Sequence, residues 1–164
     1  MSFRDLEAPA ARIAQLLTAR KETVGIAESS TGGLVSAALL AVPGASAFFM
    51  GGSVIYTRHA RRAFLGLPDP LPNGMRPSTE QYAIILAEAA RQSLDTTWGL
   101  GETGAAGPTG NRYGDKAGHS CLAVAGPIER LKTVETGSEN RDGNMWVFAL
   151  EVLTLFEDAL RAAH

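Results

Sequence analysis

The sequence predicts an α/β fold in which a mixed, mostly parallel sheet carries helices on both faces. Helical and extended stretches alternate through the amino-terminal part of the chain, which is typical of strands joined by helical crossovers. Two extended stretches near the carboxyl end, 120–125 and 128–136, follow each other through Gly126-Pro127, a pattern that favours a hairpin. Alternation followed by a hairpin indicates a sheet that combines parallel and antiparallel strands.

The first elements follow from apolar spacing and from residues that start helices. Ile13, Leu16 and Leu17 recur at helical spacing, and Pro9 suits a first helical turn. Thr57 can cap a short basic helix that follows it. In this part of the chain we expect helices at 8–21, 33–42 and 58–65, with strands at 22–27 and 47–56.

The later elements begin after a proline-rich loop at 66–77. Ser78 and Gln81 fit a capping box, which predicts a long helix that reaches about Leu94. A glycine-rich loop at 104–118 separates the next two strands. We expect strands at 97–103, 120–125 and 128–136, and a closing helix at 142–163 whose apolar face packs on the sheet.

Composition describes an ordinary globular domain that spans residues 1–164. The chain is 45% hydrophobic and 20% charged, enough apolar material for one core. A net charge of -2 and a pI near 5.9 provide no basic field, so we expect no bulk nucleic-acid binding. No apolar run approaches the roughly 18 residues that span a bilayer, and the start resembles no signal peptide. We therefore expect a cytoplasmic protein without a membrane partner.

Cysteine and histidine usage gives no sign of a disulfide or a metal site. Cys121 is the single cysteine and lies in an apolar stretch that reads as a buried strand. His119 begins that strand, His59 is predicted on a short helix, and His164 ends the chain, so no metal-ligating cluster is expected.

The segment AESSTGG at 27–33 joins the first strand to the second helix. Glycines let backbone approach a ligand, and the free N–H groups of a helix start attract an anion or a developing oxyanion. The alternative is that Ser30 or Thr31 simply caps the helix, as such residues commonly do. The segment alone leaves both interpretations open.

A second glycine-rich loop, TGAAGPTG at 103–110, follows another strand. Neither loop matches the Walker phosphate loop or a dinucleotide fingerprint. In open α/β sheets, however, ligands gather beyond the carboxyl ends of strands, so two such loops indicate a common site. The nearby run of Arg58, Arg61 and Arg62 suits a local anion site or a solvated helix face on this acidic chain.

The segments described so far resemble one known family. AESSTGG at 27–33, PGAS with GGSVIYT within 43–57, ARRAFLG at 60–66 and TGAAGPTG at 103–110 are similar to the CinA C-terminal domain family. The resemblance implies a three-layer α/β/α fold, often homo-oligomeric. It also implies hydrolysis of the amide of nicotinamide mononucleotide, a small nucleotide-like substrate, to nicotinate mononucleotide and ammonia, with no metal or redox cofactor.

The resemblance assigns catalytic roles to three positions. The family's nucleophilic serine falls on Ser29 and its tyrosine on Tyr56, while Arg61 stands where the family has lysine. A neutral lysine can take the proton of a serine hydroxyl. Arginine keeps its own proton, because its pKa exceeds roughly 12, so Arg61 cannot be that base but can hold a phosphate or carboxylate.

The same resemblance places substrate-binding residues in both loops and near the last helix. In that region Arg141 is retained, whereas Asn144 replaces a second arginine. Glu28 can orient Ser30 or a ribose hydroxyl of the ligand, or it can fix the turn by accepting backbone N–H groups. The residues expected to contact the substrate are Glu28, Ser30, Thr31, Gly32, Gly33, Thr103, Gly104, Ala106, Gly107 and Arg141.

Two functional hypotheses follow. In the first, the chain is an active amidohydrolase in which Ser29 attacks, Tyr56 accepts its proton as phenolate, and cationic Arg61 lowers the pKa of that tyrosine. In the second, the chain is a homologue that binds a nucleotide-like ligand without hydrolysing it, or hydrolyses another amide.

Overall fold

The computed structural model describes all residues, 1–164, and its strands and helices follow the predicted order. Each predicted helix and strand is present, with ends that differ by a few residues from those expected. In chain order the elements are α1 (Arg4–Arg20), β1 (Val24–Glu28), α2 (Leu34–Leu40), β2 (Phe49–Val54), α3 (Arg58–Leu65), α4 (Glu80–Leu94), β3 (Trp98–Ala105), β4 (His119–Ala125), β5 (Arg130–Glu135) and α5 (Arg141–Ala162).

The five strands form one mixed sheet in the order β2-β1-β3-β4-β5. β1 pairs in parallel with both β2 and β3, and the β3–β4 and β4–β5 pairs are antiparallel. The mixed sheet is therefore confirmed, with its pairings divided evenly between the two kinds. Parallel pairing is not the majority because β3 also pairs antiparallel with β4, which adds a second antiparallel pairing to that of the β4–β5 hairpin.

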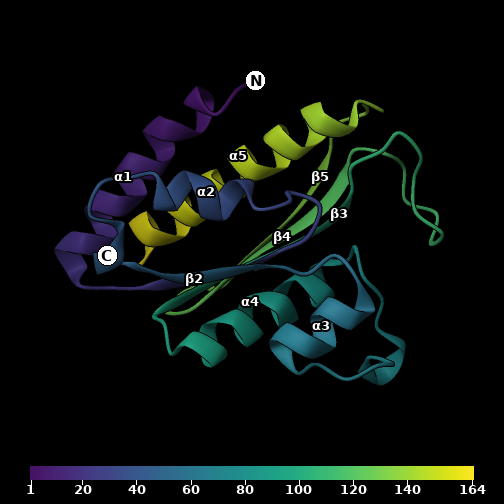
Figure 1. Ribbon diagram of the computed structural model, residues 1–164, viewed down its shortest axis with the longest axis horizontal. Coiled ribbons are helices and arrows are strands. Elements are labelled where there is room, and N and C mark those ends of the chain that lie inside the picture. Colours follow the sequence, from purple (N-terminus) through teal and green to yellow (C-terminus); the bar gives the residue numbers. More distant parts are fainter.

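Helices cover both faces of the sheet, as predicted, and make three layers. α1, α2 and α5 lie on one face, while α3 and α4 lie on the other (Figure 1). The larger core cluster, which includes Trp98, fills the space under α1, α2 and α5. No helix of the structure combines the length and the hydropathy that a membrane span requires.

Alternation along β3 explains how α4 packs so closely on the opposite face. Trp98 belongs to the larger core, whereas Gly99 and Gly101 point toward α4. A Cβ atom at Gly99 would lie 2.0 Å from the Ala87 carbonyl oxygen, and one at Gly101 would lie 2.1 Å from that of Ala83. Glycine is therefore required at both positions, because any side chain would push the helix off the sheet.

Helix starts near the site follow the predicted chemistry, with one correction. The Thr57 hydroxyl accepts the Ala60 N–H at 3.0 Å and caps α3 as predicted. The cap of α4 is Thr79, which accepts the Tyr82 N–H, and not Ser78. Ser78 has a φ of 61° and donates its own N–H to Thr103, so tertiary contact moves the helix start by one residue.

Because β1, β2 and β3 run in the same direction, their carboxyl ends meet at one edge of the sheet. Ser29 follows β1, Tyr56 lies two residues beyond β2, and Thr103 lies near the end of β3. The crossover through α2 uses one face of the sheet and that through α3 and α4 uses the other (Figure 1). The fold thus brings the predicted site residues together where open α/β sheets bind ligands.

Candidate active site

A cavity of about 300 Å³ lies at this edge of the sheet, and we call it the serine cavity. All three predicted catalytic residues line it. Its lining consists of Ser29, Ile55, Tyr56, Thr57, Arg58, Arg61, Pro77, Tyr82, Thr103, Asn111, Arg112 and Tyr113. Three arginines and no carboxylate belong to this set, so the cavity presents positive charge to a ligand.

Ser29 offers a free hydroxyl to the serine cavity. Its backbone N–H donates to the Glu102 carboxylate at 2.9 Å, which fixes the main chain. Its side-chain oxygen makes no hydrogen bond within the chain, and the residue is half-buried. The hydroxyl is held in place through its backbone and remains available to a ligand.

Tyr56 is an exposed residue whose hydroxyl is bound by an arginine from the far end of the chain. Arg141 donates to the Tyr56 oxygen at 3.2 Å and also to the carbonyl oxygen of Gly107. The hypothesis assigned the cationic neighbour of Tyr56 to Arg61, but the cation that contacts this hydroxyl is Arg141. Arg141 therefore acts on the site through Tyr56 and does not line the serine cavity.

Arg61 is buried in the wall of the serine cavity. It is 3% exposed, and one of its terminal nitrogens lies 3.2 Å from the Asp69 carboxylate. Its guanidinium carbon lies 5.8 Å from the ring centre of Tyr82. Burial raises the pKa of Tyr82 above its ordinary value, although the neighbouring arginine opposes part of that effect. The Arg61 Nε is the one buried side-chain polar atom without a hydrogen-bond partner.

Glu28 caps helix α2 from inside the protein. The side chain is fully buried and accepts the N–H groups of Gly33, Val35 and Ser36, together with the hydroxyls of Thr31 and Ser36. This is the turn-fixing alternative, and it corrects the expectation that these N–H groups face an anion from outside. The helix start is already occupied by a negative charge of the chain itself.

Glu102 accepts hydrogen bonds from the segment 29–33, which we call the serine turn, and so holds it in place. It is 1% exposed and accepts the N–H groups of Ser29 and Thr31 and the hydroxyls of Ser30 and Ser120. Ser30 and Thr31, which were expected to contact substrate, thus direct their hydroxyls inward. Sequence reasoning missed Glu102, although a glutamate inside the apolar strand WGLGETGA is a signal of a paired buried charge.

Gly32 and Gly33 shape the turn and do not line the serine cavity. Their φ angles are 64° and 101°, a region that favours glycine. They reverse the chain after the two serines and so let the Gly33 N–H meet Glu28.

The companion loop contributes one wall residue to the serine cavity. Thr103 lines it, while Gly104 packs tightly against the neighbouring strand. Ala106 and Gly107 use their carbonyl oxygens to accept hydrogen bonds from the start of α5, where Asn144 is one donor. These two residues therefore anchor α5, and they lie away from the serine cavity.

An adjoining cavity of about 300 Å³, which we call the arginine cavity, shares Arg58, Arg61 and Arg112 with the serine cavity. It adds Arg76 and Asp69. Arg58 and Arg61 were noted in the sequence as a local anion site or a solvated face. Arg112 was missed because the loop that carries it reaches the site only through tertiary contacts.

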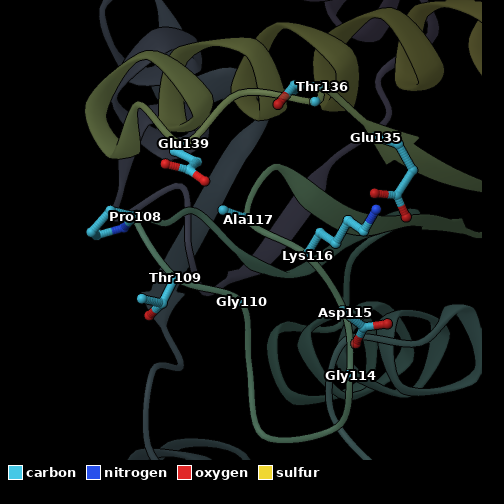
Figure 2. A pocket seen from close by; sticks show the side chains of 11 residues that line it. Pro108, Thr109, Gly110, Gly114, Asp115, Lys116, Ala117, Glu135, Thr136 and Glu139 are labelled. Atoms are coloured by element: carbon cyan, nitrogen blue, oxygen red, sulfur yellow. The ribbon is translucent and has the colours of Figure 1, made fainter.

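A larger cavity, of about 890 Å³, lies elsewhere. Figure 2 shows it between the loop that carries Pro108 and Ala117 and the segment from Glu135 to Glu139. It contains none of the predicted catalytic residues, and acidic side chains such as Asp115 dominate its charge. We therefore place the candidate active site in the smaller serine cavity, where a hydroxyl meets cations.

His119 connects the region near this larger cavity to the start of α4. Its Nδ1 lies 2.5 Å from the Glu135 carboxylate and its Nε2 lies 2.9 Å from the Ser78 carbonyl oxygen. Burial alone would lower the pKa of His119, but the hydrogen bonds to Glu135 and Ser78 raise it above the usual value. Asp115 pairs with Arg76 at 2.7 Å, which lowers the pKa of that carboxyl.

Comparison with known proteins identifies the family. The family model for the CinA C-terminal domain matches residues 6–160. The chain belongs to the CinA C-terminal domain family. A CinA-like protein of Anaeromyxobacter sp. (strain Fw109-5) is 41% identical over 155 residues, which is 94% of this chain and 38% of that protein. The chain thus spans well under half the length of this relative.

Solved structures agree with this assignment. The competence/damage inducible protein CihA from Agrobacterium tumefaciens matches with a TM-score of 0.80 at 28% identity, over 96% of this chain and 93% of that one. A CinA superfamily protein from Klebsiella pneumoniae 700603 matches with a TM-score of 0.88 at 21% identity, over 96% and 98% of the two chains. The second match supports the fold alone.

Proposed function

We propose that this chain is an amidohydrolase that cleaves the carboxamide of a pyridine mononucleotide such as nicotinamide mononucleotide. One observation carries the proposal: the free Ser29 hydroxyl shares a cavity of about 300 Å³ with Tyr56 and three arginines. A cavity of this size suits a small ligand, and its positive charge suits the phosphate of a mononucleotide. Family membership is consistent with this chemistry.

The proposed reaction uses Ser29 as nucleophile and Tyr56 as proton acceptor. The Ser29 oxygen forms a bond to the amide carbon and its proton passes to the Tyr56 phenolate. The carbon–nitrogen bond then breaks as the amide nitrogen takes that proton and leaves as ammonia. Water next attacks the serine ester; one of its protons returns to the Ser29 oxygen through Tyr56, and the other is released to solvent with the carboxylate. Arg141 donates to the Tyr56 oxygen, so a positive charge lies beside the proposed proton acceptor.

Charge that develops on the amide oxygen requires a donor other than the start of α2. Glu28 already accepts the N–H groups of that helix. The arginines of the serine cavity supply cationic donors in their place, and positioned donors of this kind stabilise a developing negative charge.

A second candidate function is ligand binding without hydrolysis. The observation that favours it is that no base of the chain is hydrogen-bonded to the Ser29 hydroxyl. Tyr56 is instead hydrogen-bonded to Arg141, and Arg61, which cannot act as a base, is bound to Asp69. A serine without an adjacent base is a weak nucleophile. Homo-oligomerisation and a cytoplasmic location stay predictions of the family resemblance and the composition.

Ammonia release separates the two functions. Purified protein is mixed with nicotinamide mononucleotide, and ammonia is measured for the wild type, for Ser29→Ala and for Ser93→Ala, an exposed serine on α4 outside the serine cavity. Hydrolysis that is lost only in Ser29→Ala supports the enzyme. A raised melting temperature without ammonia supports the binding function. If neither signal appears, both candidates are wrong.

A further inference from the structure

Arg61 is a buried cation with most of its hydrogen-bonding capacity unused. A guanidinium carries five N–H donors, and Arg61 makes one hydrogen bond, to Asp69 at 3.2 Å. The residue is 3% exposed, and its Nε lacks any partner. Buried donors are nearly always paired in folded proteins, so the unused donors of Arg61 indicate a missing acceptor.

The surroundings of Arg61 favour an anionic acceptor. Asp69 is the single carboxylate in the walls of the two adjoining cavities, and it also faces Arg58 at 3.9 Å. Arg112 lines both cavities and makes no salt bridge. Arg76, the fourth arginine of these walls, pairs with Asp115. Asp69 therefore faces the three remaining arginines, which leaves a surplus of positive charge around the unused donors.

The position of Arg61 indicates which part of a ligand it meets. Arg61 lines the same cavity as Ser29 and is buried, whereas the Arg58 side chain is 65% exposed. The group that Ser29 attacks would therefore lie beside Arg61 inside the cavity. A phosphate on the same ligand would lie nearer the exposed Arg58. At the inner position a planar guanidinium pairs well with a planar carboxylate.

We propose that Arg61 makes the serine cavity selective for a carboxylate, so that this chain binds nicotinate mononucleotide more tightly than nicotinamide mononucleotide. A carboxylate offers two acceptor oxygens to the guanidinium. A carboxamide offers one oxygen and turns an NH₂ donor toward the donors of Arg61, which leaves one of them unpaired. The inference rests on the ligand class of the proposed function. It adds that hydrolysis in this chain is opposed by tight binding of its own product.

The test is calorimetric titration with the two mononucleotides, which differ only in the carboxylate or carboxamide group. All titrations are made in a Ser29→Ala background, in which wild type refers to position 61, so that the amide is not hydrolysed during the measurement. In the wild type the acid binds about tenfold or more tighter than the amide, the size of one charge-assisted hydrogen bond. Arg61→Gln abolishes this preference, and Arg61→Lys, which keeps the charge without the planar fork, reduces it. Arg62→Gln is the matched control, because Arg62 is the exposed neighbour on α3 and lines neither cavity; it keeps the preference.

Several outcomes overturn the inference. If the wild type binds the amide as tightly as the acid, the selectivity does not exist, and this holds even if Arg61→Gln fails to fold. If Arg61→Gln weakens both mononucleotides equally, Arg61 binds the phosphate that they share. Melting temperatures of the unliganded variants show whether each one is folded.

The experiment also separates this inference from the proposed function. The acid is not a substrate, so its binding is measured independently of ammonia release. If ammonia is released and the amide binds more tightly than the acid, the proposed activity stands and the inference about Arg61 is wrong. If neither mononucleotide binds, the proposed substrate is wrong, and the titrations are repeated with free nicotinate and nicotinamide. If nicotinate then shows no binding that depends on Arg61, the proposed carboxylate site is wrong as well.

Discussion

Glu28 and Arg61 are both buried charged residues near Ser29, and they differ in the number of hydrogen bonds that they make. The Glu28 carboxylate accepts five, all from the turn and the start of α2. The Arg61 guanidinium donates one, to Asp69. The chain itself supplies the hydrogen-bond partners of Glu28 in the serine turn, whereas most N–H donors of Arg61 in the cavity wall have no partner.

This difference assigns separate tasks to the two regions. A carboxylate with all its neighbours in place holds a turn rigidly, and in doing so it uses up the helix start that would otherwise attract an anion. A buried cation with unused donors is unfavourable for stability and is retained where a ligand completes it. We therefore assign the serine turn a scaffold role and propose that the arginines recognise the ligand.

The largest effect is expected from removing the scaffold carboxylate. Glu28→Ala leaves the N–H groups of Gly33, Val35 and Ser36 buried without their acceptor, which lowers the free energy of unfolding by about 3–5 kcal/mol. Urea denaturation measures the change. Glu129→Ala, at an exposed glutamate, is the control and changes stability by less than about 0.5 kcal/mol. A loss below about 1 kcal/mol for Glu28→Ala would show that water replaces the carboxylate.

A second large effect is expected where the companion loop meets α5. Asn144 is 1% exposed, donates to the carbonyl oxygens of Ala106 and Ser138, and accepts from the Thr136 hydroxyl. Asn144→Ala leaves these groups unpaired and costs about 2–3 kcal/mol of unfolding free energy. Gln92→Ala, at an exposed amide on α4, should be nearly neutral. Equal losses for both variants would mean that Asn144 has no anchoring role.

A small effect on stability is expected at Arg61, in contrast to Glu28. Arg61→Met keeps much of the side-chain volume and removes one hydrogen bond, while Asp69 retains Arg58 as a neighbour. We expect a change within about 1 kcal/mol in either direction, because replacing a buried charge with an apolar group of similar size is often neutral. Urea denaturation beside Glu28→Ala checks it. A loss as large as that of Glu28→Ala would show that Arg61 is scaffold too.

Local chemistry could be predicted from the sequence and long-range contacts could not. Thr57 as the cap of α3 and Glu28 as a possible support of the turn both involve residues within eight positions of each other. Glu102 reaches Ser29 across 73 positions and Arg141 reaches Tyr56 across 85. Such partners depend on strand order and on the course of loops, which hydrophobic spacing does not encode. For the same reason the sequence predicted Ser78 as the cap of α4, whereas in the structure the cap is Thr79 and the Ser78 N–H donates to Thr103.

The smallest effect is a pH dependence that starts from His119, outside both compared regions. The pKa of His119 is raised in the folded protein by its hydrogen bonds to Glu135 and Ser78, with Asp115 as a further negative neighbour. A raised folded-state pKa means that protonation stabilises the fold: the stabilisation is fully present below the unfolded pKa of about 6.5 and is lost as pH rises through the higher folded value.

The wild type should therefore lose a little stability as pH rises from about 6 toward 8, and His119→Gln should remove that decline. His59→Gln, at an exposed histidine on α3 that makes no side-chain hydrogen bond or salt bridge, should retain it. Urea denaturation at a series of pH values provides the comparison. Because Ser78 also donates to Thr103 in the wall of the serine cavity, a decline that also weakens ligand binding would connect His119 to that cavity through Ser78. If binding stays constant while stability falls, His119 affects the fold alone.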